Sequence, residues 1–229
     1  MLLALDSATR QAGLALYDGE VVRAEANWSG GLYHTEWLAP TIDDALKRIN
    51  ARAADLSAVA VTRGPGSFTG LRVAMSLGKG IAAAHSLPII GISSLDVTAY
   101  PHVGLGHAVL ALLQAGRGRH AYAIYEPGGT HSALSATEPT IADIEGVAQR
   151  LAAYEAESRV HVVGELTPAE RRYLEEKMEE EIRLLPPALA VRRPAALAEL
   201  AWHRFKAGDV DDLHTLEPFY LNLPASKHS

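Results

Sequence analysis

The sequence predicts an α/β protein of two lobes, in which one order of strands and helices occurs twice. Short apolar runs typical of buried strands alternate with amphipathic stretches typical of helices over residues 1–92. The same order returns about a hundred residues further along the chain. The composition agrees, because 48% hydrophobic and 21% charged residues among 229 are ordinary for a globular protein with its own core.

The first half is predicted to run strand, strand, strand, helix, strand, helix, strand. Polar residues after Leu5 and the pair Asp18-Gly19 supply the first turns, and Gly30-Gly31 interrupts the chain before a helix with an apolar stripe. The predicted strands are residues 2–5, 13–17, 20–27, 58–61 and 89–92, and the predicted helices are residues 34–53 and 69–85.

The second half repeats this order without obvious residue identity. Its predicted strands are residues 109–113, 121–125, 132–136, 160–163 and 182–185, and its predicted helices are 141–154, 168–180 and 194–206. Three strands followed by alternating helices and strands, twice, is the order of the actin-like (ASKHA), duplicated ribonuclease H-like folds. We therefore expect a lobe at 1–100, a second lobe at 101–192, and a helix and tail at 193–229 that pack back across the lobes.

Composition excludes several classes of function. The absence of cysteine excludes disulfides, thiolate metal sites and cysteine nucleophiles. A net charge of −6 argues against a large phosphate-binding surface, so we expect a partner to hold most of any nucleic acid. The longest apolar runs are shorter than the roughly 18 residues of a membrane span, and the first residues do not form a secretion signal. We expect a cytoplasmic protein with no membrane contact.

A glycine-rich segment follows the fourth predicted strand and is the least ordinary stretch of the chain. It runs from Arg63 to Arg72 with the sequence RGPGSFTGLR. Its glycines permit close backbone approach, and the helix that follows offers free N–H groups to an anion. A tight strand-to-helix connection and a phosphate-binding loop both fit. A Walker loop does not, because no Gly-Lys-Ser/Thr follows, and Ser67 lacks the Gly-x-Ser-x-Gly frame of a nucleophile elbow.

The helix after this segment has a nearly flat face of small residues, Ala74, Gly78 and Ala82, with Leu71 and Met75 nearby. Flat faces let helices approach closely. Burial inside this chain is the default interpretation, and a contact with another subunit is the sharper alternative.

In actin-like folds, phosphates lie between the two halves near the first hairpin turn, which is Asp6-Ser7-Ala8-Thr9 here. The Asp6 carboxylate suits a metal-bound water and the hydroxyls suit a phosphate, although Asp and Ser also simply favour turns. The equivalent turn of the second half, residues 114–119, has glycines and two arginines but no carboxylate. A complete kinase site is therefore not expected.

Several of these segments together resemble the TsaB family, formerly called YeaZ. The matching stretches are LDSAT at 5–9, HTE at 34–36 before Pro40, RGPGSFTGLR at 63–72, PIIGISSL at 88–95 and, more weakly, PFYL at 218–221. The resemblance implies a non-catalytic subunit of the machinery that places threonylcarbamoyladenosine beside the anticodon of tRNA. It implies binding to the catalytic paralogue TsaD and the ATPase TsaE, a homodimer when the chain is alone, and access to tRNA only through the complex.

The resemblance also implies where subunits meet. Two helices, predicted here at 34–53 and 69–85, would assemble with a partner as a four-helix bundle. The interface residues it implies are Leu38, Ile42, Leu46, Ile49, Leu71, Arg72, Ala74, Met75, Gly78, Lys79 and Ala82. No cofactor is expected on the chain by itself; ATP or ADP at the partner boundary would at most be ordered by Asp6, Thr9 and Arg63.

The catalytic paralogue carries two metal-binding histidines four residues apart, and the matching positions here are Ser94 and Thr98. Hydroxyls replace imidazoles poorly at a transition metal, so we expect neither metal nor catalysis. An ATP-dependent small-molecule kinase of the same fold is the alternative, motivated by Asp6, Thr9 and the glycine-rich segment. A glycoprotease has almost no chemical support in this sequence.

Overall fold

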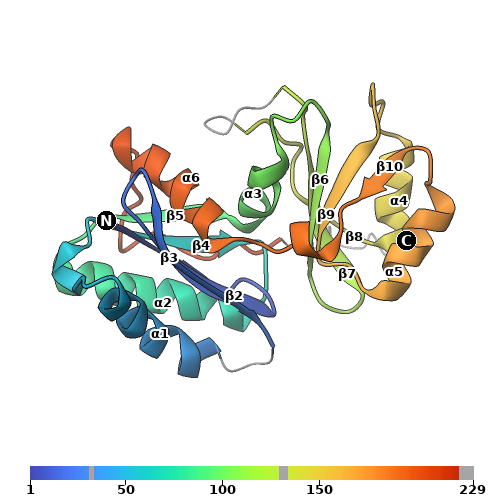
Figure 1. Ribbon diagram of the computed structural model, residues 1–229. Helices are drawn as coiled ribbons and strands as arrows, with labels where there is room; N and C mark the ends of the chain where they lie inside the picture. Colours follow the sequence, from blue (N-terminus) through green and yellow to red (C-terminus); the bar gives the residue numbers. More distant parts are fainter. Residues whose placement is uncertain (31–33, 129–133, 222–229) are drawn as a thin grey trace.

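In the computed structural model, which describes residues 1–30, 34–128 and 134–221, the chain forms two five-stranded mixed sheets (Figure 1). Their strand orders are β3-β2-β1-β4-β5 and β8-β7-β6-β9-β10, so the second sheet repeats the connectivity of the first. In each, the first two strand pairs are antiparallel and the remaining two are parallel. The predicted duplicated, two-lobed α/β fold is confirmed.

The first sheet lies between helices on both faces. Its strands are β1 (Leu2–Asp6), β2 (Gln11–Tyr17), β3 (Val22–Ser29), β4 (Ala58–Gly64) and β5 (Ile89–Ser93). Helices α1 (His34–Arg48) and α2 (Phe68–His85) cover one face, and α6 (Pro194–Lys206) covers the other (Figure 1). The first four residues of β1 and of β4 are all apolar, because both faces of these central strands are buried.

The second sheet has helices α4 (Ile144–Ala152) and α5 (Pro168–Lys177) on its outer face. Its strands are β6 (Val109–Gln114), β7 (Arg119–Tyr125), β8 (Thr140–Asp143), β9 (Val160–Gly164) and β10 (Ile182–Leu184). Single 3₁₀ turns lie at Ala53–Asp55, Tyr100–His102 and Pro187–Leu189. The duplication extends to backbone detail, since β4 and β9 end in glycines with φ of +117° and +123°, a region that favours glycine.

A short helix that the sequence did not predict, α3 (Ser94–Ala99), lies between the lobes. Its Val97 packs in the core of the first lobe, whereas Leu95 and Ala99 pack in the core of the second. Every residue of α3 except Asp96 is buried. One helix thus contributes side chains to the cores of both lobes. The lobe boundaries at residues 100 and 192 stay a prediction.

The third strand of the second lobe lies later in the chain than predicted. The predicted strand 132–136 begins outside the described residues, and Ala136 makes only an isolated bridge to Tyr125. The strand that pairs with β7 is Thr140–Asp143, the start of the predicted helix 141–154. The helix begins at Ile144, three residues later than predicted, because the Asp143 side chain accepts the N–H of Gly146 at 2.9 Å as an N-cap.

The outer edge of β5 is covered by the segment that follows α6. The N–H of Asp211 donates to the carbonyl of Ile89 at 2.9 Å, and the Asp211 carboxylate accepts the N–H of Gly91 at 2.8 Å. Arg204 of α6 donates to the Gly91 carbonyl at 2.9 Å. Side-chain and backbone groups of this chain thus occupy the place of a sixth strand.

Within the described residues, none of the helices combines the length and the apolar character that crossing a membrane requires.

Candidate functional site

Four polar side chains meet between the lobes, and we call this group the interlobe centre: Asp6, Thr9, Glu165 and Arg192. Asp6 ends β1 and Thr9 lies in the turn after it, Glu165 follows β9 of the second lobe, and Arg192 precedes α6. Arg192 is 1% exposed, and an arginine is rarely buried this deeply unless it is paired. The centre therefore joins both lobes and the segment that returns from the second lobe to the first.

The guanidinium of Arg192 is the hub of the interlobe centre. Its Nε donates to Asp6 Oδ2 at 2.6 Å, its Nη2 to Thr9 Oγ1 at 3.0 Å, and its Nη1 to Glu165 Oε1 at 3.4 Å. The Thr9 hydroxyl donates to Glu165 in a short hydrogen bond. The nearby carboxylates outweigh burial and hold the pKa of Arg192 above its ordinary value, so the side chain stays charged.

The remaining capacity of Asp6 is also used inside the chain. Its Oδ1 accepts the Thr62 hydroxyl at 2.8 Å and the N–H of Ala8 at 2.9 Å. Asp6 is 1% exposed and Thr9 is 5% exposed. Two of the three predicted nucleotide contacts are therefore covered in this structure.

Arg63, the third predicted nucleotide contact, does not join Asp6 and Thr9. It follows Thr62 in β4, and consecutive strand residues point to opposite faces, so the Thr62 hydroxyl reaches Asp6 and Arg63 cannot. Arg63 instead lines a separate cleft of about 320 Å³ with Asp96, Arg204 and Phe219. The structure divides the predicted nucleotide site between two places.

The glycine-rich segment packs against the turn after β1. A Cβ atom on Gly66 would lie 2.2 Å from the carbonyl oxygen of Ala8, and one on Gly70 would lie 2.1 Å from that of Ser7. Ser67 donates its N–H to the Ala8 carbonyl at 2.6 Å, and the Ser7 hydroxyl donates to the Gly70 carbonyl at 2.7 Å. These glycines permit close approach of two backbone segments, which is the tight-connection interpretation.

The smallest residues of the predicted interface are buried within this chain. The face formed by Ala74, Gly78 and Ala82 lies on the lobe's own sheet, and a Cβ on Gly78 would lie 2.6 Å from Val61 Cγ1. Eight of the eleven predicted residues are buried in the first lobe: Leu38, Ile42, Leu46, Leu71, Ala74, Met75, Gly78 and Ala82.

The other three predicted residues, Ile49, Arg72 and Lys79, are half-buried or exposed. Ile42 and Leu46, although buried, line a groove of about 460 Å³ between α1 and α2. Arg72 lies over the Phe68 ring at 3.9 Å and donates to the Tyr220 hydroxyl at 3.3 Å, while Lys79 donates to the His214 carbonyl at 3.4 Å. Both cations therefore contact the chain's own C-terminal segment.

Ser94 and Thr98, which match the metal-binding histidines of the catalytic paralogue, lie on α3 between the lobes. They are 0% and 3% exposed, and the Thr98 hydroxyl donates to the Ser94 carbonyl at 2.8 Å. Among the described residues, no group of three His, Cys, Asp or Glu side chains is placed to hold a metal ion.

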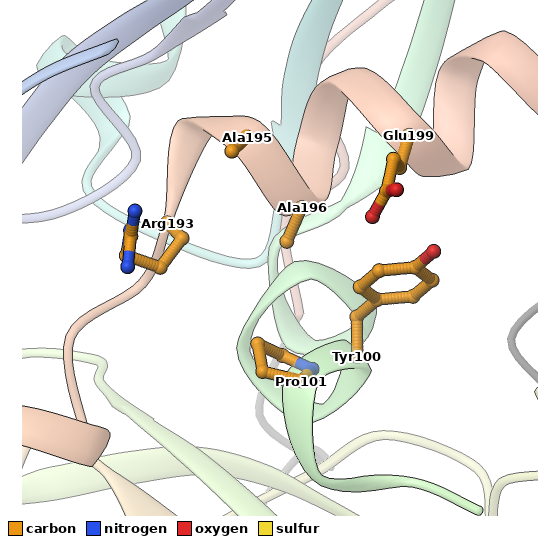
Figure 2. A pocket seen from close by; sticks show the side chains of 6 residues that line it. All are labelled: Tyr100, Pro101, Arg193, Ala195, Ala196 and Glu199. Atoms are coloured by element: carbon orange, nitrogen blue, oxygen red, sulfur yellow. The ribbon is translucent and has the colours of Figure 1, made fainter. Parts of the chain in front are cut away.

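Figure 2 shows another groove, of about 500 Å³, beside the start of α6. Glu25 accepts the N–H of Ala195 at 3.1 Å and two hydrogen bonds from Arg193 Nε at 3.0 Å, so the helix start already has a carboxylate partner. The Tyr100 ring lies beside Glu199, and its pKa is raised mainly by burial and then by the negative charge of that carboxylate. The charged groups that line this groove interact with the chain itself, and we assign no ligand site to the groove.

His120, which lies near Glu165 of the interlobe centre, is expected to make the stability of the fold depend on pH. The ring is 1% exposed and lies 3.5 Å from Glu170 of α5. Burial lowers the pKa of His120 below its ordinary value of 6.5, although Glu170 and Glu165 oppose that shift. The unfolded chain thus binds the proton more readily, and we expect stability to fall as pH drops below about 6.5, by at most about 1.4 kcal/mol per pH unit for this group.

Urea unfolding at pH 7.5, 6.5 and 5.5 measures this effect. His120→Gln is expected to have a flatter dependence of unfolding free energy on pH, whereas the exposed His203→Gln is expected to keep the wild-type slope. An unchanged slope in His120→Gln would contradict the assignment.

The strand order, the repeated connectivity and the buried polar centre between the lobes together define a duplicated actin-like protein of two lobes. A family described as TsaD, tRNA N6-adenosine threonylcarbamoyltransferase, matches residues 30–227. The chain belongs to this family.

Comparison with individual proteins confirms the resemblance to TsaB. The chain is 34% identical to the Escherichia coli tRNA threonylcarbamoyladenosine biosynthesis protein TsaB over 55% of this chain and 54% of that protein. It is 26% identical to Bacillus subtilis TsaB over 97% and 94% of the two chains. YeaZ from Pseudomonas aeruginosa has the same fold, with a TM-score of 0.79 at 23% identity over 96% and 99%. The match spans about half of the E. coli protein.

Sequence reasoning missed Arg192 and Glu165. They lie 186 and 156 residues from their partners in the first lobe. No local spacing links them to those partners. The available local signal was the presence of charged residues at the ends of elements, Arg192-Arg193 before a helix and Glu165 after a strand.

Proposed function

We propose that this chain is a non-catalytic subunit required for transfer of the threonylcarbamoyl group to the adenosine next to the anticodon of tRNA. It binds the catalytic paralogue TsaD and the ATPase TsaE, pairs with itself when alone, and meets tRNA only through the complex. The observation that carries the proposal is the burial of Ser94 and Thr98. Where the paralogue holds a metal, this chain has two hydroxyl side chains packed between its lobes.

The outer surface of α1 and α2 is the docking face that we propose for TsaD. One side of α2 presents small exposed residues at four-residue intervals, Ser76, Gly80 and Ala84. The groove beside it is lined by Ala39, Ile42, Leu46, Ala51, Leu77 and Ile81. A flat stripe next to an apolar groove suits a pair of helices from a partner, because small residues allow close approach and the groove accepts larger side chains.

Reconstitution tests the role. With purified TsaD, TsaE, tRNA and the small substrates of the reaction, modified adenosine is expected only when this chain is present. Normal product formation without it would overturn the proposal.

We also propose ATP or ADP at the boundary with TsaD, where Arg63 is the most accessible of the three predicted contacts. The structure gives no support to the kinase alternative, because Asp6 and the glycine-rich segment are engaged within the chain.

Gly80→Leu tests the docking face. Nothing lies within 4 Å of a Cβ at Gly80, so the variant is expected to fold, while a leucine here separates two closely packed helices. We expect co-purification with TsaD to fall at least tenfold. Gly128→Leu, also open but in the second lobe, serves as the matched control and is expected to bind normally. Equal binding by both variants would place the contact elsewhere.

A further inference from the structure

The interlobe centre lies where the actin-like fold brings a phosphate and its metal ion to the first hairpin turn. The residues expected to receive them do not fit such a group in this chain. Both oxygens of Asp6 are engaged, one by Arg192 and the other by Thr62 and Ala8. The glycine-rich segment, which would have to stand back from a phosphate, is instead in direct backbone contact with the turn.

The guanidinium of Arg192 is the cation of the interlobe centre. Carboxylates reach it from both lobes, Asp6 at 2.6 Å and Glu165 at 3.4 Å, and the Thr9 hydroxyl bonds both Arg192 and Glu165. Glu165 also accepts the N–H of Gln114 at the second lobe's equivalent turn, at 3.2 Å. A planar guanidinium with several donors can hold two carboxylates and a hydroxyl at once, which a lysine cannot.

We propose that Arg192 is an internal replacement for the metal-bound nucleotide of this fold, and that it fastens the two lobes in one arrangement. In an actin-like protein that binds nucleotide, the ligand bridges the lobes and its exchange lets them move. Here the bridge is part of the chain, so the lobes are held without a ligand. This inference does not depend on which partner the α1 and α2 surface binds.

The charges give the proposal a direct consequence. Asp6 and Glu165 carry two negative charges against the single positive charge of Arg192. Removing the guanidinium leaves two carboxylates and a hydroxyl around an emptied volume, an oxygen ligand set that suits Mn²⁺ or Mg²⁺. An Arg192→Ala chain is therefore expected to acquire the cation site that the wild type lacks.

The first experiment uses the unaltered full chain. Calorimetric titration with MgATP, and separately with MnCl₂, is expected to give no saturable heat up to millimolar ligand. Saturable MgATP binding that Asp6→Asn abolishes would overturn the proposal. The titration of the wild type does not depend on the folding of a variant. Because it uses the isolated chain, its outcome can be distinguished from a failure of reconstitution with TsaD and TsaE.

The second experiment follows thermal unfolding of Arg192→Ala. Its Tm is expected to fall by roughly 10 °C, as follows from leaving buried carboxylates unpaired. Millimolar MnCl₂ or methylguanidinium chloride should then raise its Tm by several degrees relative to the same ionic strength of NaCl. The wild type and Arg183→Ala, which removes an exposed arginine of the second lobe, should not respond. Equal responses of all three proteins, or no response of Arg192→Ala to either cation, would overturn the proposal.

Discussion

Replacing Gly78 by leucine is expected to unfold the first lobe under conditions in which the wild type is stable. The Cβ alone would lie 2.6 Å from Val61 and 3.3 Å from Val59 in the strand beneath it, and the rest of a leucine would have to enter that strand. Overpacking a dense core costs about 1–3 kcal/mol and more when the backbone must move. We expect a loss of at least about 3 kcal/mol in urea unfolding, because β4 is the central parallel strand of the sheet.

Gly80→Leu is the control, two residues further along the same helix. It adds the same side chain in open space, and the higher helix propensity of leucine is expected to raise stability by up to about 1 kcal/mol. Comparing the two variants separates the effect of a side chain packed against the sheet from the effect of one on the proposed docking face. A Gly78→Leu protein as stable as Gly80→Leu would mean that α2 presents a different face to the sheet.

Asp6→Ala is expected to be the most damaging single change in the interlobe centre. It leaves the guanidinium of Arg192 buried without its shortest charged partner. Removing one member of a buried ion pair costs about 3–5 kcal/mol, because the remaining charge is neither paired nor hydrated. Urea unfolding followed by circular dichroism measures the loss.

Asp43→Ala is the matched comparison, because Asp43 pairs with Lys47 on the exposed side of α1 and little change is expected. Adding Arg192→Met to Asp6→Ala is expected to restore part of the lost stability by removing the orphaned charge. If Asp6→Ala proved as mild as Asp43→Ala, Glu165 and Thr9 alone would be sufficient to hold the guanidinium.

Much of the fold could be predicted from the sequence, because the strands and helices are marked by local patterns. The central strands are continuous apolar runs, and helices begin at side chains that cap them, such as Ser67 and Thr167. β8 was misplaced because none of its four residues is fully buried, two of them being exposed, and they carry no strong strand pattern. α3 was missed because six residues are too few to show a period.

The candidate site was harder to predict, because it depends on which side of an element faces the core. Ala74, Gly78 and Ala82 form one small-residue stripe of α2, and Ser76, Gly80 and Ala84 form another, with the same spacing. Only the structure shows that the first lies on Val59 and Val61. Similarly, Asp6 and Thr9 were predicted as nucleotide contacts, and their partner Arg192 lies far away in the sequence.

The covered edge of β5 affects how the protein behaves at high concentration. An open strand edge recruits strands from other molecules, and this is a common route to aggregation. At this edge the backbone groups of Ile89 and Gly91 are already bonded to Asp211 and Arg204. The first sheet therefore offers no template for intermolecular strand growth at these positions of the β5 edge.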